Sequence, residues 1–538
     1  MSTGTITPYR APRRTGNDGF WQLLHAEWTK FRTVRGWLIA VIIAAGLIVG
    51  VAALLPRGSN QCGSGSQSGA ACLAKYPIGP GGEAVSDSYY FVRQPLAGNG
   101  TITVRVTSLT GMYSDQGGFQ GGGQAPGVRS GLVPWAKAGI IITQSTKQGS
   151  AYAAMMVTGS HGVRMQYNYT SDSAGLAGAA TAASPRWLRL TRSGDTITGY
   201  DSADGRRWTK VGIAHLSGLG SIVQAGLFAT SPAYEQSNNP NVYSEPGGST
   251  SPSIATGVFD HVSLKGAAAG AWTGQFVGDG GGSSDGPNGV FGKSTQPGFR
   301  HVGEQFTVTG YGDIAPEVAG DTGNDTISDH LFGVFIGLTI FLILAVLFIT
   351  GEYRRGLIRT TLAASPRRGR VLAAKALVIG VVTFVLGTAA AALAVTIGLQ
   401  LAHGSGIYVL PVSWLTELRV MAGVGALLAL AAVFALSLGV ILRRSAVAVG
   451  AAFLTIVLPY VLGASGALPR EAAIWLLRVS PAAAFALEQS VPQYPQVFNQ
   501  YAPPDYYPLA PWAGLAVLCA YAAGALGLAL YLLRRRDA

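Results

Sequence analysis

Six long apolar runs constrain this chain more than any other feature. Each has about 20 residues or more, the length a helix needs to cross a hydrocarbon core about 30 Å thick. The third run alone includes a basic residue, Lys375, close enough to its start to extend toward the membrane surface. We predict an α-helical polytopic membrane protein whose six transmembrane helices are 37–55, 330–350, 371–401, 420–442, 446–466 and 512–533.

The basic residues beside these runs set the predicted orientation. If the helices alternate in direction, 18 Lys and Arg fall on one side, and the short loops of the other side hold only Arg419, Arg470 and Arg478. Because Lys and Arg are retained in the cytoplasm, we expect a plasma-membrane protein with both termini cytoplasmic and residues 56–328 extracytoplasmic. The alternative for the first run is a cleaved signal peptide, but this run exceeds the usual apolar length of about 7–15 residues.

The distribution of charge argues against a nucleic-acid partner. The chain has 38 Lys and Arg and 26 Asp and Glu, and residues 56–328 contain 17 of each. The whole net charge of +12 therefore belongs to the membrane part. Nucleic-acid binding calls for a basic face on a folded domain, whereas a basic excess beside apolar runs is typical of membrane topology and of contact with lipid phosphates.

Two predicted cytoplasmic segments flank the first run and follow the second. Residues 1–18 read as a disordered tail, and 19–36 as an amphipathic elbow helix in the membrane interface. The elbow's apolar stripe consists of Phe20, Leu23, Leu24 and Phe31, with Trp28 beside it. Glu27, Lys30 and Arg32 lie off this stripe. In the loop 351–370, Glu352 lies among arginines with which it can pair, and the stretch from Gly356 to Pro366 suits one short helix.

These segments resemble the type-2 ABC transporter permeases. The resemblance rests on AEWTKFRT before the first helix and on ITGEYRRGLIRTTLAASPRRGRVLAAK after the second. It implies a permease that dimerises with an identical or different copy and recruits a separate ATPase, with ATP bound on that partner. By position, the loop residues that it implies for ATPase docking are Glu352, Arg354, Arg355, Gly356, Arg359, Pro366 and Arg367. An apolar stretch at 469–489, broken at Ser480-Pro481, resembles the external helical hairpin of this family.

The source of free energy is expected to lie on another chain. Carriers coupled to protons or sodium generally place ionisable residues near the middle of the membrane, and the six runs have none there. The best match to a phosphate-binding loop, GPNGVFGKST, has Pro287 where the pattern requires glycine. We therefore expect no cofactor on this chain.

A long segment between the first and second runs has the pattern of a β domain. After a Gly/Ser-rich tether at 56–83, short strand-like stretches recur with polar turns between them. They predict an all-β sandwich over 84–265 and a Gly-rich juxtamembrane segment over 266–328, with one further strand pair at 303–316. The nine stretches are 101–107, 139–144, 151–157, 163–169, 187–191, 196–201, 207–212, 223–229 and 258–264.

This segment resembles the concanavalin-A-like jelly rolls in WAKAGI, RWLRLTRSGDTITGYDSADGRRWTKVG and VFDHVSL. The resemblance implies a fold rather than a function, because such domains include lectins, glucanases and spacers. Trp135, Trp187 and Trp208 are candidates for stacking on sugar rings, with packing in the sandwich as the alternative. Cys62 and Cys72 form either a disulfide or two free thiols.

Together these features predict the permease of an ATP-driven exporter for a hydrophobic or amphiphilic substrate. The alternative is a surface protein, a sensor or adhesin, that binds glycans without transporting anything. A glycosidase is disfavoured because the predicted strands carry few carboxylates for acid–base chemistry.

The predicted orientation can be tested by cysteine labelling in intact cells. A membrane-impermeant thiol reagent should modify Tyr200→Cys and leave Thr360→Cys unmodified until the cells are permeabilised. The reverse pattern would contradict the assignment of 56–328 to the outside.

Overall fold

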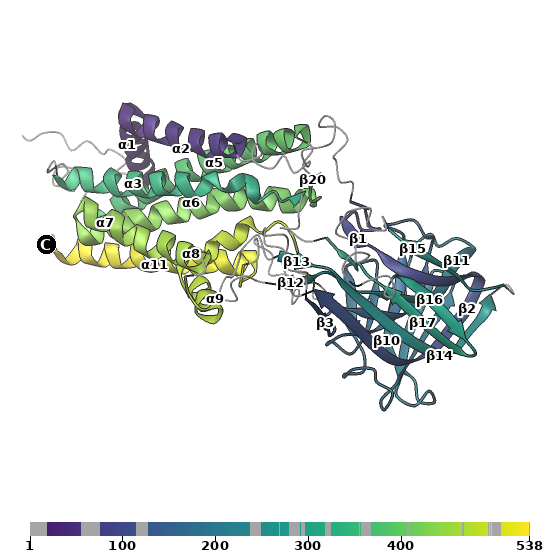
Figure 1. Ribbon diagram of the computed structural model, residues 1–538. Coiled ribbons are helices and arrows are strands. Elements are labelled where there is room, and N and C mark those ends of the chain that lie inside the picture. The colour runs from purple at the N-terminus through teal and green to yellow at the C-terminus, as the bar shows by residue number, and fades with distance from the viewer. Residues whose placement is uncertain are drawn as a thin grey trace, which may run out of the picture.

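The structure, a computed structural model, consists of two parts that lie end to end (Figure 1). One is a helical bundle built from the N-terminal helices and the helices after residue 328, and the other is a β domain between them in sequence. The residues described are 19–54, 76–114, 127–236, 249–267, 270–278, 291, 296–317, 324–354, 356, 367–405, 408–464, 467–492, 494, 497 and 507–536.

Six helices in the described part of the chain are long and apolar enough to cross a membrane. This confirms the predicted fold class of a helical membrane part with an inserted β domain. The helices are α2 (Arg35–Leu54); α3 (Gly333–Arg354), which follows the short η3 (Asp329–Leu331); α5 (Arg368–Gly404); α6 (Trp414–Leu442); the continuous α7 (Ser445–Ala452), η4 (Phe453–Val457) and α8 (Leu458–Ala464); and α11 (Pro511–Arg536).

Small residues allow these helices to pack closely around α6, which contacts α3, α5 and α11. A Cβ on Gly425 of α6 would come within 2.0 Å of Thr388 Oγ1 on α5, and one on Gly387 would come within 2.7 Å of Leu428. Apolar lipid provides no hydrophobic drive for helix association, so close backbone approach and van der Waals contact hold such bundles together. The glycines therefore set the distance between α5 and α6.

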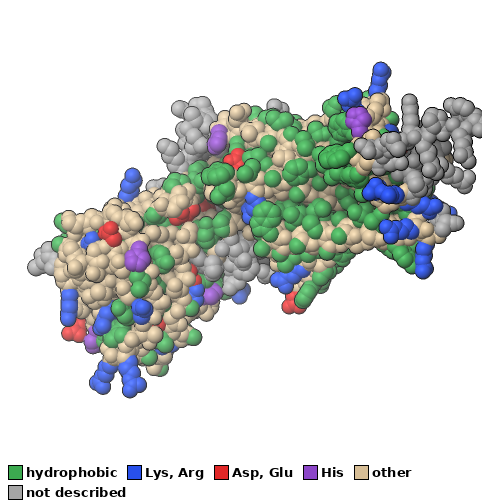
Figure 2. Space-filling model, turned by 180° about the vertical axis from the view of Figure 1, so that it is seen from behind, with side chains coloured by type: hydrophobic (Ala, Val, Ile, Leu, Met, Phe, Trp, Pro, Cys, Tyr) green, Lys and Arg blue, Asp and Glu red, His purple; other side chains and the backbone are tan. Residues whose placement is uncertain are grey.

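The surface of the bundle is divided by residue type. Hydrophobic side chains cover its sides, and Lys and Arg gather at the end away from the β domain (Figure 2). At that same end α1 (Phe20–Thr33) lies across the bundle (Figure 1). Val34 has an extended backbone and turns the chain from α1 into α2.

The end of the bundle nearest the β domain carries short elements. These include α9 (Arg470–Val479) and η5 (Pro481–Glu488), which lie within the stretch 469–489. The η5 segment is buried and packs against α6 and α11. Close by, β19 (Asn324–Asp325) pairs in parallel with β20 (Tyr408–Val409).

The β domain is one antiparallel sheet folded into two layers, and β2 (Tyr89–Ser114) runs through both. Its first half pairs with β11 and β15, and its second half with β8 and β14. The fold places β4, β5 and β6 against β8, β9 and β10. The other strands of this sheet are β3 (Val128–Ser130), β4 (Lys137–Thr143), β5 (Tyr152–Thr158), β6 (Val163–Tyr167), β7 (Ser171–Ala174), β8 (Arg186–Ser193), β9 (Thr196–Ser202), β10 (Thr209–His215), β11 (Ile222–Thr230), β14 (Ser253–Ala267), β15 (Thr273–Val277), β16 (Gly298–Val302) and β17 (Gln305–Gly310). A separate pair is formed by β12 (Tyr234–Gln236) and β13 (Ser249–Ser251).

Alternation along the strands produces the core between the layers. In β8, Leu188 and Leu190 point inward and are fully buried, whereas Arg189 between them is partly exposed. All nine stretches predicted from sequence coincide with strands of this sheet. The sheet also extends past residue 265, because β15 and β16 come from the part of 266–328 that was expected to be a Gly-rich connection. β17 and β18 (Ile314–Pro316) are the two strands predicted within 303–316, but they do not pair with each other: β17 pairs with β14 and β16, and β18 with β1 (Val85–Asp87).

The two ends of the β domain lie side by side where it meets the bundle. β1 (Val85–Asp87) pairs antiparallel with β18 (Ile314–Pro316). Next to this pair, the rings of Tyr76 and Tyr408 lie 4.9 Å apart, and Ala84 packs with Leu410. The domain is thus joined to the bundle through two short strands and the loops beneath them.

Two buried polar contacts tie the β1–β18 pair to the main sheet. Lys137 on β4 is fully buried, and its Nζ lies 2.5 Å from Asp313 Oδ1. Asp87 Oδ2 accepts hydrogen bonds from the Tyr169 hydroxyl at 2.7 Å and from the Gly149 amide at 2.9 Å. Burial raises the pKa of Asp87 to about 6, although both hydrogen bonds act in the opposite direction.

This raised pKa predicts a pH-dependent stability. The unfolded pKa is about 3.9, so the stability that proton binding provides is complete below it and is lost as the pH rises through about 6. In Asp87→Asn, the melting temperature relative to the parent chain should therefore rise between pH 4.5 and 7.5, by the equivalent of up to about 3 kcal/mol.

The control is Asp204→Asn in an exposed turn. Backbone hydrogen bonds from Arg207 and Arg206 lower the pKa of Asp204 to about 2, so both its folded and unfolded values lie below this pH window. Its difference from the parent should not change across the window. A constant difference for Asp87→Asn as well would show that this carboxyl does not titrate as described.

Candidate functional site: a charge cluster at the end of the bundle

A buried lysine connects three helices at the end of the bundle that carries α1. Lys375 lies two turns into α5, and its side chain is fully buried. Its Nζ lies 2.6 Å from Glu27 Oε2 on α1 and 2.7 Å from Glu352 Oε1 on α3. One ammonium therefore holds two carboxylates that are 325 positions apart in the sequence.

A second lysine completes the cluster. Lys30 Nζ lies 2.8 Å from Glu27 Oε1 and 3.3 Å from Glu352 Oε1. Burial acts against its charge, but hydrogen bonds and attraction from the two glutamates outweigh this effect, and the pKa of Lys30 is raised. Two lysines and two glutamates thus share the cluster, and their formal charges cancel.

Aromatic rings close the cluster on its membrane side. Lys375 Nζ lies 4.9 Å from the centroid of the Phe348 ring. Phe31 and Trp37 each pack edge-on against that ring at 6.0 Å. Because Lys375, Glu27 and Glu352 are largely buried, their charges depend on their partners. Removing one partner of these groups is far more costly than removing a surface ion pair.

The partners of these residues differ from those expected from sequence. Glu352 pairs with Lys375 and Lys30 rather than with the neighbouring arginines. Lys375 extends toward the end of the bundle, where it pairs with Glu27 of α1 and with Glu352 in the last turn of α3. Glu27 was placed off the apolar stripe of α1, but it lies on the buried face with Phe31. Two features of the sequence could have indicated this cluster. One is a charged residue within an apolar run, and the other is an i, i+3 Glu–Lys pair on the adjoining helix.

The other residues predicted to dock an ATPase lie beside this cluster or outside the described chain. Arg354 is exposed at the end of α3, and Arg367 is exposed immediately before α5. Gly356 has a φ of 69°, and its amide donates to the Tyr353 carbonyl at 3.2 Å. This left-handed glycine ends the helix, as is common after the last helical turn. The remaining predicted docking residues, which the structure does not describe, are Arg355, Arg359 and Pro366.

The tryptophans proposed to bind sugars separate into two groups. Trp135 is buried and stacks on His161, with centroids 3.9 Å apart. Trp187 and Trp208 are partly exposed on β8 and just before β10. The guanidinium of Arg189 lies 3.7 Å from the Trp208 ring centroid.

Packing also covers part of Trp187. A Cβ added at Gly205 would come within 2.7 Å of the indole, so the backbone lies against one side of it. The predicted disulfide partners Cys62 and Cys72 fall outside the described residues. Within the described chain, no group of three or more His, Cys, Asp or Glu is arranged to hold a metal ion.

Comparison with known families identifies the membrane part. The model of a family described as "ABC-2 family transporter protein" matches residues 141–538, which include most of the β domain and the five helices after it. The chain belongs to the ABC-2 transporter family. This ABC-2 chain is thus an ABC-type permease and a multi-pass membrane protein, and membership in the family implies an ABC ATPase partner.

Other comparisons with the ABC-2 chain add little. No curated protein matches it. Among solved structures, a functionally unknown protein from Saccharomyces cerevisiae is 16% identical, with 37% of this chain and 85% of that chain covered and a TM-score of 0.21. Scytalido-glutamic peptidase with a transition state analog inhibitor is 9% identical, with 41% and 98% covered and a TM-score of 0.26. These TM-scores are too low to support an argument about fold or activity.

The charge cluster predicts unequal effects of its two lysines on stability. Lys375→Met leaves two buried carboxylates with one half-exposed lysine, so the free energy of unfolding should fall by about 3–5 kcal/mol. Thermal unfolding of the detergent-solubilised chain measures this loss.

Two variants serve as controls. Lys30→Met should cost about 1 kcal/mol or less, because the Lys30 side chain is half-exposed. Adding Glu27→Gln to Lys375→Met should recover part of the loss, because one unpaired charge is removed. Equal losses for both lysines, with no recovery in the double variant, would contradict the role given to Lys375.

Proposed function

We propose that this chain is the permease subunit of an ATP-driven exporter for hydrophobic or amphiphilic substrates, powered by a separate ABC ATPase. The supporting observation is the Lys375 cluster, which joins α1, α3 and α5 where the 351–370 loop begins and ends. In this proposal the α1 end of the bundle is cytoplasmic, consistent with the Lys and Arg gathered there (Figure 2). The β domain then faces the outside.

The cluster gives the loop a direct mechanical connection to the membrane. An ATPase pressing on residues 351–370 would displace the end of α3 and the start of α5. These ends cannot separate from each other or from α1 without exposing paired charges to an apolar medium, which is costly. We therefore expect the three elements to move as one unit during the ATPase cycle.

Two continuous helices would carry this movement across the membrane. α5 spans 37 residues and α3 spans 22, and both reach the end of the bundle that faces the β domain. We propose that two copies of the permease form the substrate path between them, and that the path opens outward when the ATPase subunits close.

The glycan-binding alternative is less well supported. Arg189 packs over Trp208, and the backbone at Gly205 lies against Trp187, so each indole already has a protein partner. Stacking on sugar rings would require a free aromatic face.

Cross-linking to the ATPase tests the proposed docking surface. Affinity purification of the full chain from its native membrane should recover a subunit with a phosphate-binding loop. Arg354→Cys and Arg367→Cys should form cross-links to that subunit with a short thiol-reactive reagent, above the background that the parent chain's own cysteines give.

The matched control is Ser405→Cys, an exposed position at the other end of α5. It should give no cross-link to the ATPase. Cross-linking through Ser405→Cys alone, or transport by the purified chain without any ATPase, would overturn the proposal.

A further inference from the structure

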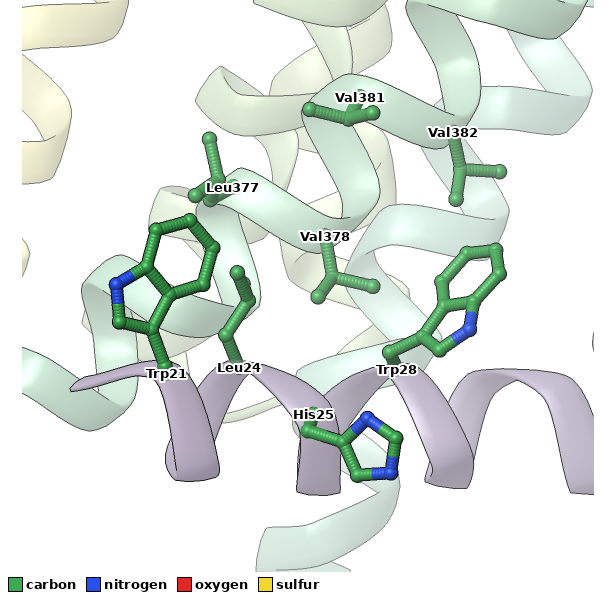
Figure 3. Close-up of a pocket in the computed structure, with 8 residues that line it drawn as sticks. All are labelled: Trp21, Leu24, His25, Trp28, Leu377, Val378, Val381 and Val382. Carbon is green, nitrogen blue, oxygen red and sulfur yellow. The ribbon is translucent and has the colours of Figure 1, made fainter. Parts of the chain in front are cut away.

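An apolar pocket lies between α1 and α5, and none of the four residues of the charge cluster lines it. Its volume is about 500 Å³, within the range of about 300–1,000 Å³ typical of small-molecule sites. Trp21 and Trp28 stand on either side, with Val378 between them and His25 at the edge (Figure 3). The full lining is Trp21, Leu24, His25, Trp28, Leu377, Val378, Val381 and Val382.

The pocket lies at the level where a bilayer's apolar core would begin. Leu377 and Val378 come two and three residues after Lys375, whose cluster marks the end of the bundle, and α5 continues from there as an apolar span. Trp21 is 78% exposed and Val381 is 51% exposed, although both belong to the lining. Tryptophan is enriched at this depth, where its ring lies between headgroups and acyl chains.

The surrounding charge indicates what occupies the pocket. Arg32 lies four residues after Trp28 and is therefore on the same face of α1. It is exposed, and no carboxylate in the described part of the chain pairs with it. An apolar cavity with an unpaired guanidinium one helical turn away matches an amphiphile that has an acyl chain and an anionic headgroup.

We propose that the pocket binds an anionic phospholipid of the surrounding leaflet, with an acyl chain between α1 and α5 and the phosphate at Arg32. The lipid would fill the space that remains between α1 and α5. Glu27 and Phe31 already hold α1 on the bundle, and the lipid would add a second contact beside them. Binding of the lipid does not depend on the proposed transport activity.

Photolabelling of the full chain in nanodiscs tests this site. The probe is phosphatidylglycerol with a diazirine on one acyl chain, diluted in unlabelled phosphatidylcholine, and labelled peptides are mapped by mass spectrometry. Label is expected on the α1 segment 20–33 and on 377–382. A phosphatidylcholine probe should label these peptides about fivefold less, the effect of about one basic side chain at a lipid surface.

Variants at exposed positions separate the pocket from the general lipid shell. Val381→Trp should fill the cavity and reduce labelling of α1 at least about fivefold, whereas Val385→Trp, one turn further along α5 and 55% exposed, should leave it unchanged. Trp21→Ala removes one wall of the pocket at a largely exposed position and should also reduce the label. Arg32→Gln should abolish the preference for phosphatidylglycerol, and Arg370→Gln should keep it.

Three outcomes would overturn the proposal. Equal loss in Val381→Trp and Val385→Trp would mean that the probe reports the lipid shell alone. Equal labelling by the two probes would show that the pocket does not prefer an anionic headgroup. Absence of label together with a disulfide between two Trp21→Cys chains would show that a second copy of this chain covers the pocket.

Discussion

A fully buried ammonium requires partners within the protein, and in this bundle that requirement fixes how three helices meet. Lys375 can remain charged inside the bundle because Glu27 and Glu352 lie within 2.7 Å of it and Lys30 balances the second negative charge. Each contact comes from a different helix or a different turn. Any displacement of α1, α3 or α5 alone would leave a charge without its partner, and the cost of that rises as water is excluded.

A similar arrangement occurs at the other end of the bundle, where the β domain joins it. Its first and last strands, β1 and β18, pair with each other, so one domain is inserted into the connection between α2 and α3 without separating their ends. Lys137 and Asp313 tie this pair to the main sheet through a second buried ion pair. The β domain and the helical bundle thus each rely on a buried lysine at the place where separate segments converge.

α1 makes two kinds of contact with the rest of the bundle. Glu27, Lys30 and Phe31 contact the charge cluster and its rings, and Trp21, Leu24 and Trp28 line the pocket against α5. The ion pairs have strict geometry. The apolar contacts at the pocket can adapt, since van der Waals packing has little directional preference. In the proposed function, α1 would follow α3 and α5 while these apolar contacts adjust.

The sequence by itself determined the number and approximate positions of the apolar helices and the places of nine strands, because length, charge and the period-2 alternation are local properties. It also determined that the positive and negative charges of residues 56–328 cancel, and that Lys and Arg cluster beside particular apolar runs. Only the tertiary structure decided that Glu27, Glu352 and Lys375 meet. Periodicity classifies Glu27 as a surface residue because it counts polarity along one helix, whereas burial of a charge depends on a partner from a distant segment. For the same reason the strands at 273–277 and 298–302 looked like a connection: their pairing with β2 and β17 is set by contacts across the domain and leaves little trace in their own sequence.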